Sequence, residues 1–260
     1  MSVALVSGVT AFLFFKSILL TLLFLSTPFF FAKFYKISKH VTLRAIAAKE
    51  LGRERFSKIY EMVDLLAIKA ELNYVPSLYL IPSDLPNSMA IGDSHESGIG
   101  ISYGLINHLN TFELYGVLAH EISHIKNQDY KTLKLLHISY AMVSLLSFFV
   151  NILVLLSLPL VLMGKVSIGL PILLAALFAP NFIQLLILGL MRNYEYNADL
   201  TASQLTGDPL YLASALLKIN EFQRSRLKNF LIHRVDDETH WLDTHPSSLS
   251  RVRRLYKLSK

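Results

Sequence analysis

The amino-acid sequence predicts a predominantly α-helical protein with a small β-sheet (α+β), integral to a membrane through about three transmembrane helices. Three observations support this fold class. Of the 260 residues, 53% are hydrophobic and only 17% are charged, whereas about 25% of residues in a soluble domain are charged. Three apolar stretches are long enough to cross a bilayer. The polar remainder combines helical patterns with short β-type segments, and its length suits one compact soluble domain.

The first apolar stretch runs from Val3 to Ala32 and contains a single charged residue, Lys16. It is too long for the apolar core of a signal peptide and has no small-residue cleavage pattern, so we do not interpret it as a removable leader. It is too short for two spans of about 20 residues each. It therefore predicts one long, tilted or kinked helix, which forms an N-terminal transmembrane domain over residues 1–34. Lys16 is interpreted as snorkelling or pairing rather than as functional.

Two further apolar stretches, Ile138–Met163 and Val166–Met191, are separated by only Gly164 and Lys165. This spacing predicts a tight antiparallel hairpin over residues 138–190, inserted into the soluble domain. Three amide side chains lie inside these spans: Asn151, Asn181 and Gln184. They are interpreted as interhelical hydrogen-bonding groups, with a path for a polypeptide as the alternative.

Basic residues flank the apolar stretches on one side only. No Lys or Arg precedes the first stretch, and the hairpin tip carries only Lys165. The flanking basic residues are Lys33, Lys36, Lys39, Arg44, Lys49, Arg53, Arg55, Lys126, Lys131, Lys134 and Arg192. The positive-inside rule then places the N-terminus outside and the soluble domain, residues 35–137 and 191–260, in the cytoplasm. The net charge of +6 is assigned to lipid attraction and topology rather than to nucleic acid.

Helical and strand patterns divide the soluble part. The predicted helices are Ser38–Leu72, Tyr103–Leu109, Arg192–Leu205, Pro209–Phe222 and a basic helix from Ser247. The predicted strands are Ser77–Ile81, Met89–Ile91 and Ser97–Ser102. Asn110 is a good N-cap, and Glu113 three residues later completes a capping box. A further helix therefore begins at Thr111.

The helix from Thr111 carries the sequence His-Glu-Ile-Ser-His at residues 120–124. His120 and His124 are four residues apart, so both imidazoles project from one helical face and can bind one tetrahedral Zn²⁺. Glu121 lies beside the first ligand and can act as general base on a zinc-bound water. The chain has no cysteine, so any metal must be held by His, Asp or Glu.

A catalytic zinc needs a third protein ligand. Asp129 follows His124 by five residues, and we expect its side chain to point elsewhere on the helix. Glu195 and Asp199 are four residues apart after the hairpin, which returns the chain to the same side. Glu195 is the predicted third ligand of one zinc per chain, and Asp199 is predicted to accept a hydrogen bond from a ligand histidine and fix its tautomer. Alone, such a pair is usually a solvated helix face.

Together these segments carry a resemblance to a known family. His-Glu-Ile-Ser-His, two membrane spans and then Arg-Asn-Tyr-Glu-Tyr-Asn-Ala-Asp at 192–199 resemble the HtpX-type membrane zinc metallopeptidases, relatives of the CAAX prenyl proteases. The segments Leu85–Ala90, Gly100–Gly104 and Thr244–Ser247 resemble three further pieces of that family. The family generally has two spans before its soluble domain, where this chain offers one, and the segment around Asn87 departs from its pattern.

The resemblance implies a gluzincin-like zinc peptidase domain. It maps the zinc ligands onto His120, His124 and Glu195, and the catalytic base onto Glu121. Arg192 and Asp199 fall on family residues close to the metal. His245 falls on a histidine that can approach the active cleft, where it would donate to the developing oxyanion. Orientation of the C-terminal helix is an equal alternative for His245.

The function implied is peptide-bond hydrolysis in membrane-protein quality control and stress response, at a bacterial-type inner (plasma) membrane. Its partners are polypeptide substrates, chiefly misfolded or damaged membrane proteins, and the lipid bilayer; nucleic acid is not expected, and a homo-oligomer is left open. The substrate is expected to extend along an edge strand, Ser97–Ser102. The predicted substrate edge consists of Asn87, Ser97, Gly98, Ile99 and Gly100. The alternative is a membrane scaffold or chaperone-like adaptor that binds zinc without cleaving; a transporter is disfavoured because the spans bury few charges.

Overall fold

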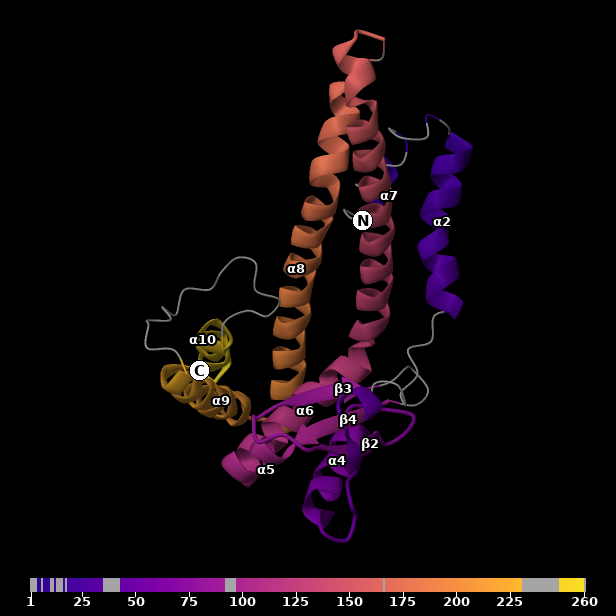
Figure 1. Cartoon of the computed structure of the whole chain (residues 1–260). Coiled ribbons are helices and arrows are strands. Elements are labelled where there is room, and N and C mark those ends of the chain that lie inside the picture. The colour runs from indigo at the N-terminus through magenta and orange to yellow at the C-terminus, as the bar shows by residue number, and fades with distance from the viewer. Residues whose placement is uncertain are drawn as a thin grey trace. The chain divides into compact units, whose positions relative to one another are not determined.

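The structure is a computed structural model of the whole chain (Figure 1), and it describes residues 4–5, 7–9, 12, 16, 18–34, 43–91, 97–165, 167–230 and 248–259. The chain divides into two compact units. The first comprises Met1–Lys36 and Lys131–Met191, and the second comprises Ile37–Tyr130 and Arg192–Lys260. Since the second unit holds the sheet and the His-Glu-Ile-Ser-His helix, it carries the candidate site.

The first unit is built from long apolar helices. They are α2 (Ile18–Phe34) and the greater parts of α7 (Asp129–Leu162) and α8 (Leu170–Thr206), whose residues 129–130 and 192–206 belong to the second unit. Of the described helices, α7 and α8 are long and apolar enough to cross a membrane, and they run side by side in Figure 1. A small buried cluster of Val143, Ala179, Ile183 and Ile187 packs between them, while most of their leucines and phenylalanines are exposed, as expected of surfaces that face lipid.

A tight reversal ends α7. Gly164 has φ +69°, its N–H donates to the Val161 carbonyl at 3.0 Å, and the Lys165 N–H donates to the Leu160 carbonyl at 2.9 Å. This pair of bonds is a Schellman motif, which needs a residue with positive φ and so favours glycine. The connection to α8 covers residues 163–169, longer than the two residues predicted.

The single helix predicted over Val3–Ala32 is wrong. Helix α2 begins only at Ile18, and Lys16, which has φ 52°, lies outside any helix. A residue in the left-handed region cannot continue a right-handed helix. The apolar stretch is therefore interrupted at its one charged residue.

The second unit contains one four-stranded sheet. Its strands are β1 (Lys49–Glu50), β2 (Ser77–Ile81), β3 (Ser88–Ile91) and β4 (Gly98–Ser102), in the order β1-β2-β4-β3. Strand β4 pairs in parallel with β2 and antiparallel with β3, and all five of its residues are buried. The predicted substrate edge at Ser97, Gly98, Ile99 and Gly100 is therefore wrong, because both sides of β4 are already hydrogen-bonded. Among the described strands, β3 and β1 have the free edges.

The helix predicted over Ser38–Leu72 is not continuous: among its described residues, 43–45 are helical and α4 (Ser57–Lys69) forms the second half. Strand β1 and a turn over residues 53–56 lie between these two parts, and residues 38–42 lie outside the described part of the chain. The Leu51 N–H donates to the Leu78 carbonyl at 3.0 Å, and the Leu51 side chain is buried in the core. Leu51 therefore contributes to the sheet side of the core, although its spacing also fits a helical stripe.

The predicted capping box is confirmed at the start of α6 (Thr111–Asn127). The Glu113 N–H donates to Asn110 Oδ1 at 2.9 Å, and the Asn110 N–H donates to Glu113 Oε2 at 2.8 Å. Glu113 also accepts hydrogen bonds from Ser214 at 2.7 Å and Lys218 at 2.8 Å. Burial alone would raise the pKa of Glu113, but these donors outweigh burial and hold the pKa below its usual value.

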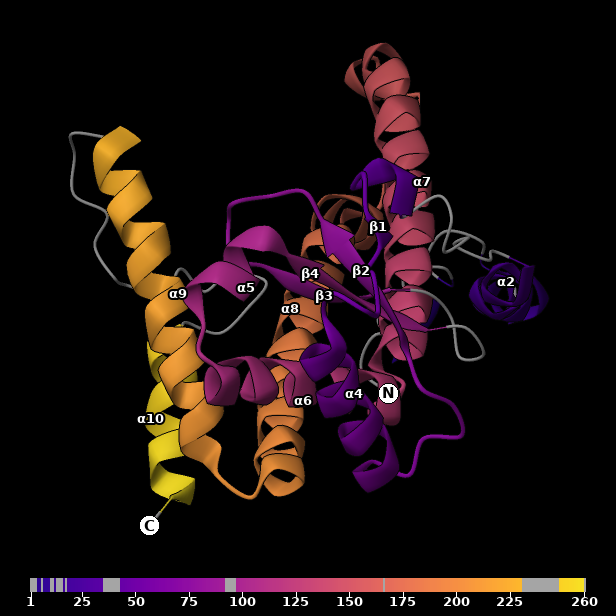
Figure 2. The same cartoon turned by 90° about the horizontal axis from the view of Figure 1, so that it is seen from below.

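Three helices complete the second unit around α6: α5 (Tyr103–His108), α9 (Pro209–Phe230) and α10 (Ser248–Leu258). A Cβ on Gly116 would lie 2.6 Å from the Leu212 backbone nitrogen, so only glycine permits the close approach of α6 to α9. Leu118 and Ile122 of α6 are fully buried in the main core. Helix α10 runs along α9 (Figure 2). The core thus fixes α6 on several sides.

Candidate metal centre

Two histidines on successive turns of α6 begin the site. Because His120 and His124 are four residues apart, their rings project from the same face, with centroids 4.7 Å apart. Their Nε2 atoms lie 3.2 Å from each other. His120 is buried and His124 is partly buried, so the pair does not lie on a solvated helix face.

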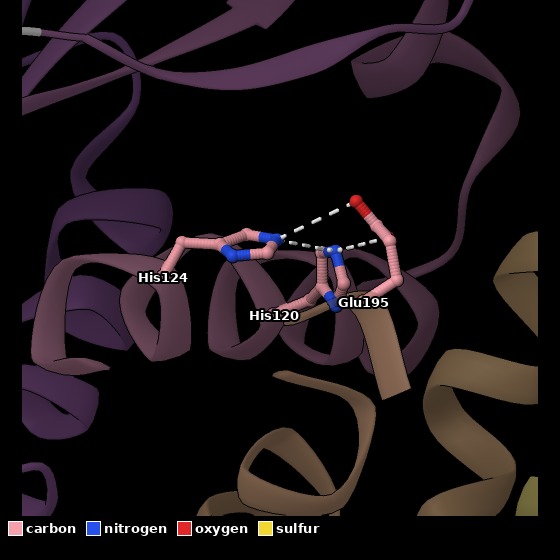
Figure 3. A group of neighbouring side chains, drawn as sticks. All are labelled: His120, His124 and Glu195. Atoms are coloured by element: carbon pink, nitrogen blue, oxygen red, sulfur yellow. Dashed lines mark hydrogen bonds and ion pairs between the residues drawn. The ribbon is translucent and has the colours of Figure 1, made fainter. Parts of the chain in front are cut away.

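Glu195, on α8, approaches the same two nitrogen atoms (Figure 3). Its Oε2 lies 3.4 Å from His120 Nε2, and its Oε1 lies 3.9 Å from His124 Nε2. One ligand atom from each of the three side chains falls within 4.8 Å of the others. The structure therefore brings together the three residues predicted to bind a metal.

Each histidine also contacts a carboxylate through its other ring nitrogen. His120 Nδ1 lies 3.1 Å from Asp199 Oδ1, and His124 Nδ1 lies 2.8 Å from Asp129 Oδ2. An Nδ1–H that donates to a carboxylate leaves the Nε2 lone pair available for a metal. Both Nε2 atoms thus face the point that Glu195 approaches, and Asp199 has the contact predicted for it.

The expectation that Asp129 points elsewhere is wrong. Gln128 has φ 54°, which ends α6 in the left-handed conformation, and Asp129 begins α7. The change of direction lets the Asp129 side chain return to His124. A continuous helix would not place a residue five positions on against the same histidine, and sequence spacing gave no signal of the break.

Arg251 of α10 is a site residue that the sequence did not predict. Its guanidinium contacts both Asp199 oxygens, with Nε at 2.9 Å from Oδ2 and Nη2 at 2.6 Å from Oδ1. Its Nη1 lies 2.9 Å from Glu195 Oε2. Arg192, the arginine named from the sequence, is half-buried on α8 one turn before Glu195, and its role stays a prediction.

Glu121 lies beside the ligands without being one of them. Its side chain is buried, and Ser88 Oγ of β3 donates to its Oε1 at 2.6 Å. The carboxylate is therefore held between α6 and the free-edge strand. Ser88 was not predicted, and the adjoining Asn87 pairs through its backbone with Ser102. His245 lies outside the described residues.

The carboxylates also determine the charge of His120. Burial and the Arg251 guanidinium each lower the pKa of His120, but hydrogen bonds to Asp199 and Glu195 outweigh them and raise it to about 9. A cation that binds the His120 nitrogen therefore competes with a proton for it.

A model of peptidase family M48 matches residues 53–259 of the chain. The chain belongs to this family. The protease HtpX homologue of Pyrococcus furiosus is 32% identical over 240 residues, which cover 86% of this chain and 81% of that protein. The homologue of Acaryochloris marina is 33% identical over 239 residues, 86% of this chain and 79% of that protein. The homologue of Acidiphilium cryptum is 34% identical over 191 residues, 73% of this chain and 65% of that protein.

Among solved structures, the crystal structure of S. mikatae Ste24p matches with a TM-score of 0.55 at 18% identity, covering 97% of this chain and 61% of that chain. At this identity the likeness shows the fold alone. The chain thus spans less than two thirds of Ste24p and of the Acidiphilium protein. The resemblance to HtpX-type peptidases is confirmed, and the M48 family and the HtpX relatives support a membrane metalloprotease.

Proposed function

We propose that this M48 chain is a zinc-dependent endopeptidase that hydrolyses peptide bonds of misfolded or damaged membrane proteins on the cytoplasmic side of a bacterial-type inner membrane. The observation that carries the proposal is the convergence of His120 Nε2, His124 Nε2 and the Glu195 carboxylate, with Glu121 beside them. Two imidazoles and one carboxylate are a ligand set typical of catalytic zinc, and they leave a coordination position open. The residues present therefore fit one Zn²⁺.

Within this site the metal and the side chains divide the chemistry. Zinc, when bound, polarises a carbonyl and acidifies water. Glu121 takes the proton of the attacking water and passes it to the leaving amine. His245 is proposed to donate a hydrogen bond to the developing oxyanion. Asp199 and Asp129 keep the ligand histidines in the tautomer that frees Nε2.

The proposed substrate edge is now β3. Strand β3 pairs only with β4 among the described strands, and its first residue, Ser88, contacts Glu121. A polypeptide that adds to this edge gains main-chain hydrogen bonds whatever its sequence. The proposed substrate edge includes Asn87, which directly precedes β3, and it does not include Ser97–Gly100.

Removal of metal tests the proposal. We expect the detergent-solubilised full chain to lose cleavage of a fluorescently labelled, unfolded protein after chelation and desalting. Addition of Zn²⁺ equal to the protein concentration should restore cleavage, and Mg²⁺ should not, since Mg²⁺ prefers an octahedral site with several water ligands. The measurement is the cleavage rate plotted against zinc content. Full cleavage by protein from which the zinc has been removed would refute a zinc peptidase.

Asp129→Asn is expected to weaken zinc binding by about 10–100-fold, the usual effect of losing such a partner of a ligand histidine. The amide keeps the size of the side chain but loses the charge that orients the His124 ring. Competition with a chromophoric chelator measures the dissociation constant. The matched control is Asp64→Asn on α4, whose carboxylate pairs with Arg53 on the surface. Equal zinc affinities of Asp129→Asn and Asp64→Asn would show that Asp129 does not contribute to zinc binding.

A further inference from the structure

Arg251 is placed unlike the other arginines of its helix. Its side chain is 10% exposed, whereas Arg253 and Arg254 of α10 are exposed. The inward face of α10 also buries Val252 and Leu255. Burial of an arginine is costly unless charged partners surround it. The burial of Arg251 therefore depends on the carboxylates that it contacts.

The contacts of Arg251 join two different carboxylates of the site. Nε and Nη2 bind both oxygens of Asp199, while Nη1 binds Oε2 of Glu195. Glu195 is the proposed zinc ligand, and Asp199 orients the ligand His120. The planar fork of a guanidinium can make these bonds at once, and an ammonium cannot.

Two further contacts place α10 against the turn of α8 that carries Glu195. Arg254 lies over the ring of Tyr196, 4.7 Å from its centroid, and Ser250 Oγ lies 3.3 Å from the Tyr196 hydroxyl. Tyr196 is the neighbour of Glu195 in the chain. Helix α10 therefore contacts α8 through residues on both sides of Arg251.

We propose that Arg251 is a positioning residue, which holds Glu195 and Asp199 in the arrangement that binds the metal and so makes the C-terminal helix part of the metal site. The inference rests on the proposed zinc site. The direction in which zinc affinity changes on loss of Arg251 distinguishes positioning from a simple charge effect. A guanidinium close to a cation repels it, so if charge alone mattered, loss of Arg251 would strengthen zinc binding. Loss of positioning weakens zinc binding.

Three variants of the full chain test this inference by chelator competition and by the absorption spectrum of bound Co²⁺. Arg251→Met is expected to weaken zinc binding by about 10–100-fold and to change the Co²⁺ spectrum. Arg251→Lys keeps the charge but loses the fork, and we expect intermediate affinity. Arg253→Met removes an exposed charge from the same helix and should match the wild type.

The outcomes separate this inference from the proposed function. Wild-type protein that binds no zinc would overturn both. Wild-type binding together with unchanged or tighter binding by Arg251→Met would overturn the inference alone. If Arg251→Met proves misfolded by circular dichroism, Arg251→Lys decides: an affinity and Co²⁺ spectrum equal to the wild type would overturn the inference, because the guanidinium fork would not be needed to position the two carboxylates.

Discussion

Replacement of Glu121 by Gln is expected to slow peptide cleavage severely while the bound zinc stays in place. Gln has the same shape and its carbonyl oxygen can still accept the hydrogen bond of Ser88, but an amide cannot take a proton from water. General base catalysis is typically worth about 10²–10⁴-fold in rate, so the cleavage rate should fall by that range. The zinc ligands His120 and His124 are untouched.

Cleavage of a labelled unfolded protein and metal analysis of the same samples measure both parts of this result. Glu221→Gln makes the same chemical change on the exposed surface of α9 and should leave cleavage and zinc content unchanged. Full activity of Glu121→Gln would remove Glu121 from catalysis. A wild-type protein that binds zinc stoichiometrically and cleaves no substrate would favour the scaffold instead.

Replacement of Glu195 by Gln is expected to act on the metal rather than on a proton. A neutral amide is a poor zinc ligand compared with a carboxylate. The change also leaves Arg251 with one of its two carboxylate partners. We expect zinc affinity to fall by more than the roughly 100-fold upper range for loss of an outer hydrogen bond, and cleavage to fall in parallel.

Titration with zinc in the presence of a chelator separates this variant from Glu121→Gln. High zinc concentration should restore part of the cleavage by Glu195→Gln, because the catalytic base is intact, and none of the cleavage by Glu121→Gln. Glu221→Gln again serves as the control. Zinc content equal to that of the wild type in Glu195→Gln would move the third ligand to another residue.

The parts of the site that lie within one helix were predictable from the sequence. The capping box at Asn110 and the shared face of His120 and His124 depend only on spacing along α6. Glu195 was predicted as well, because the hairpin returns the chain to the same side and Glu195 lies at helical spacing from Asp199, and the family resemblance pointed to the same residue. Such local rules need no knowledge of how distant segments pack.

The remaining contacts depend on packing that the sequence does not encode locally. Ser88 reaches Glu121 across 33 positions, and Arg251 reaches Asp199 across 52. The assignment of Ser97–Ser102 as an edge strand failed for the same reason: β3 lies between β2 and β4 in the sequence but outside them in the sheet. Period-two patterns in short strands indicate which side chains face the core, and they do not reveal the order of the strands in the sheet.

Glu113 connects the start of α6, the helix that carries the two histidines, to α9. The same carboxylate that caps the first turn of α6 holds Ser214 and Lys218 of α9, and α9 in turn supports α10. Heating or proteolytic cutting that detaches α9 would therefore remove two of the partners of the α6 capping carboxylate. It would also move Arg251, on α10, away from Glu195 and Asp199. Release of zinc and detachment of α9 and α10 should then occur in one transition. Bound zinc would therefore indicate that these two C-terminal helices are in place.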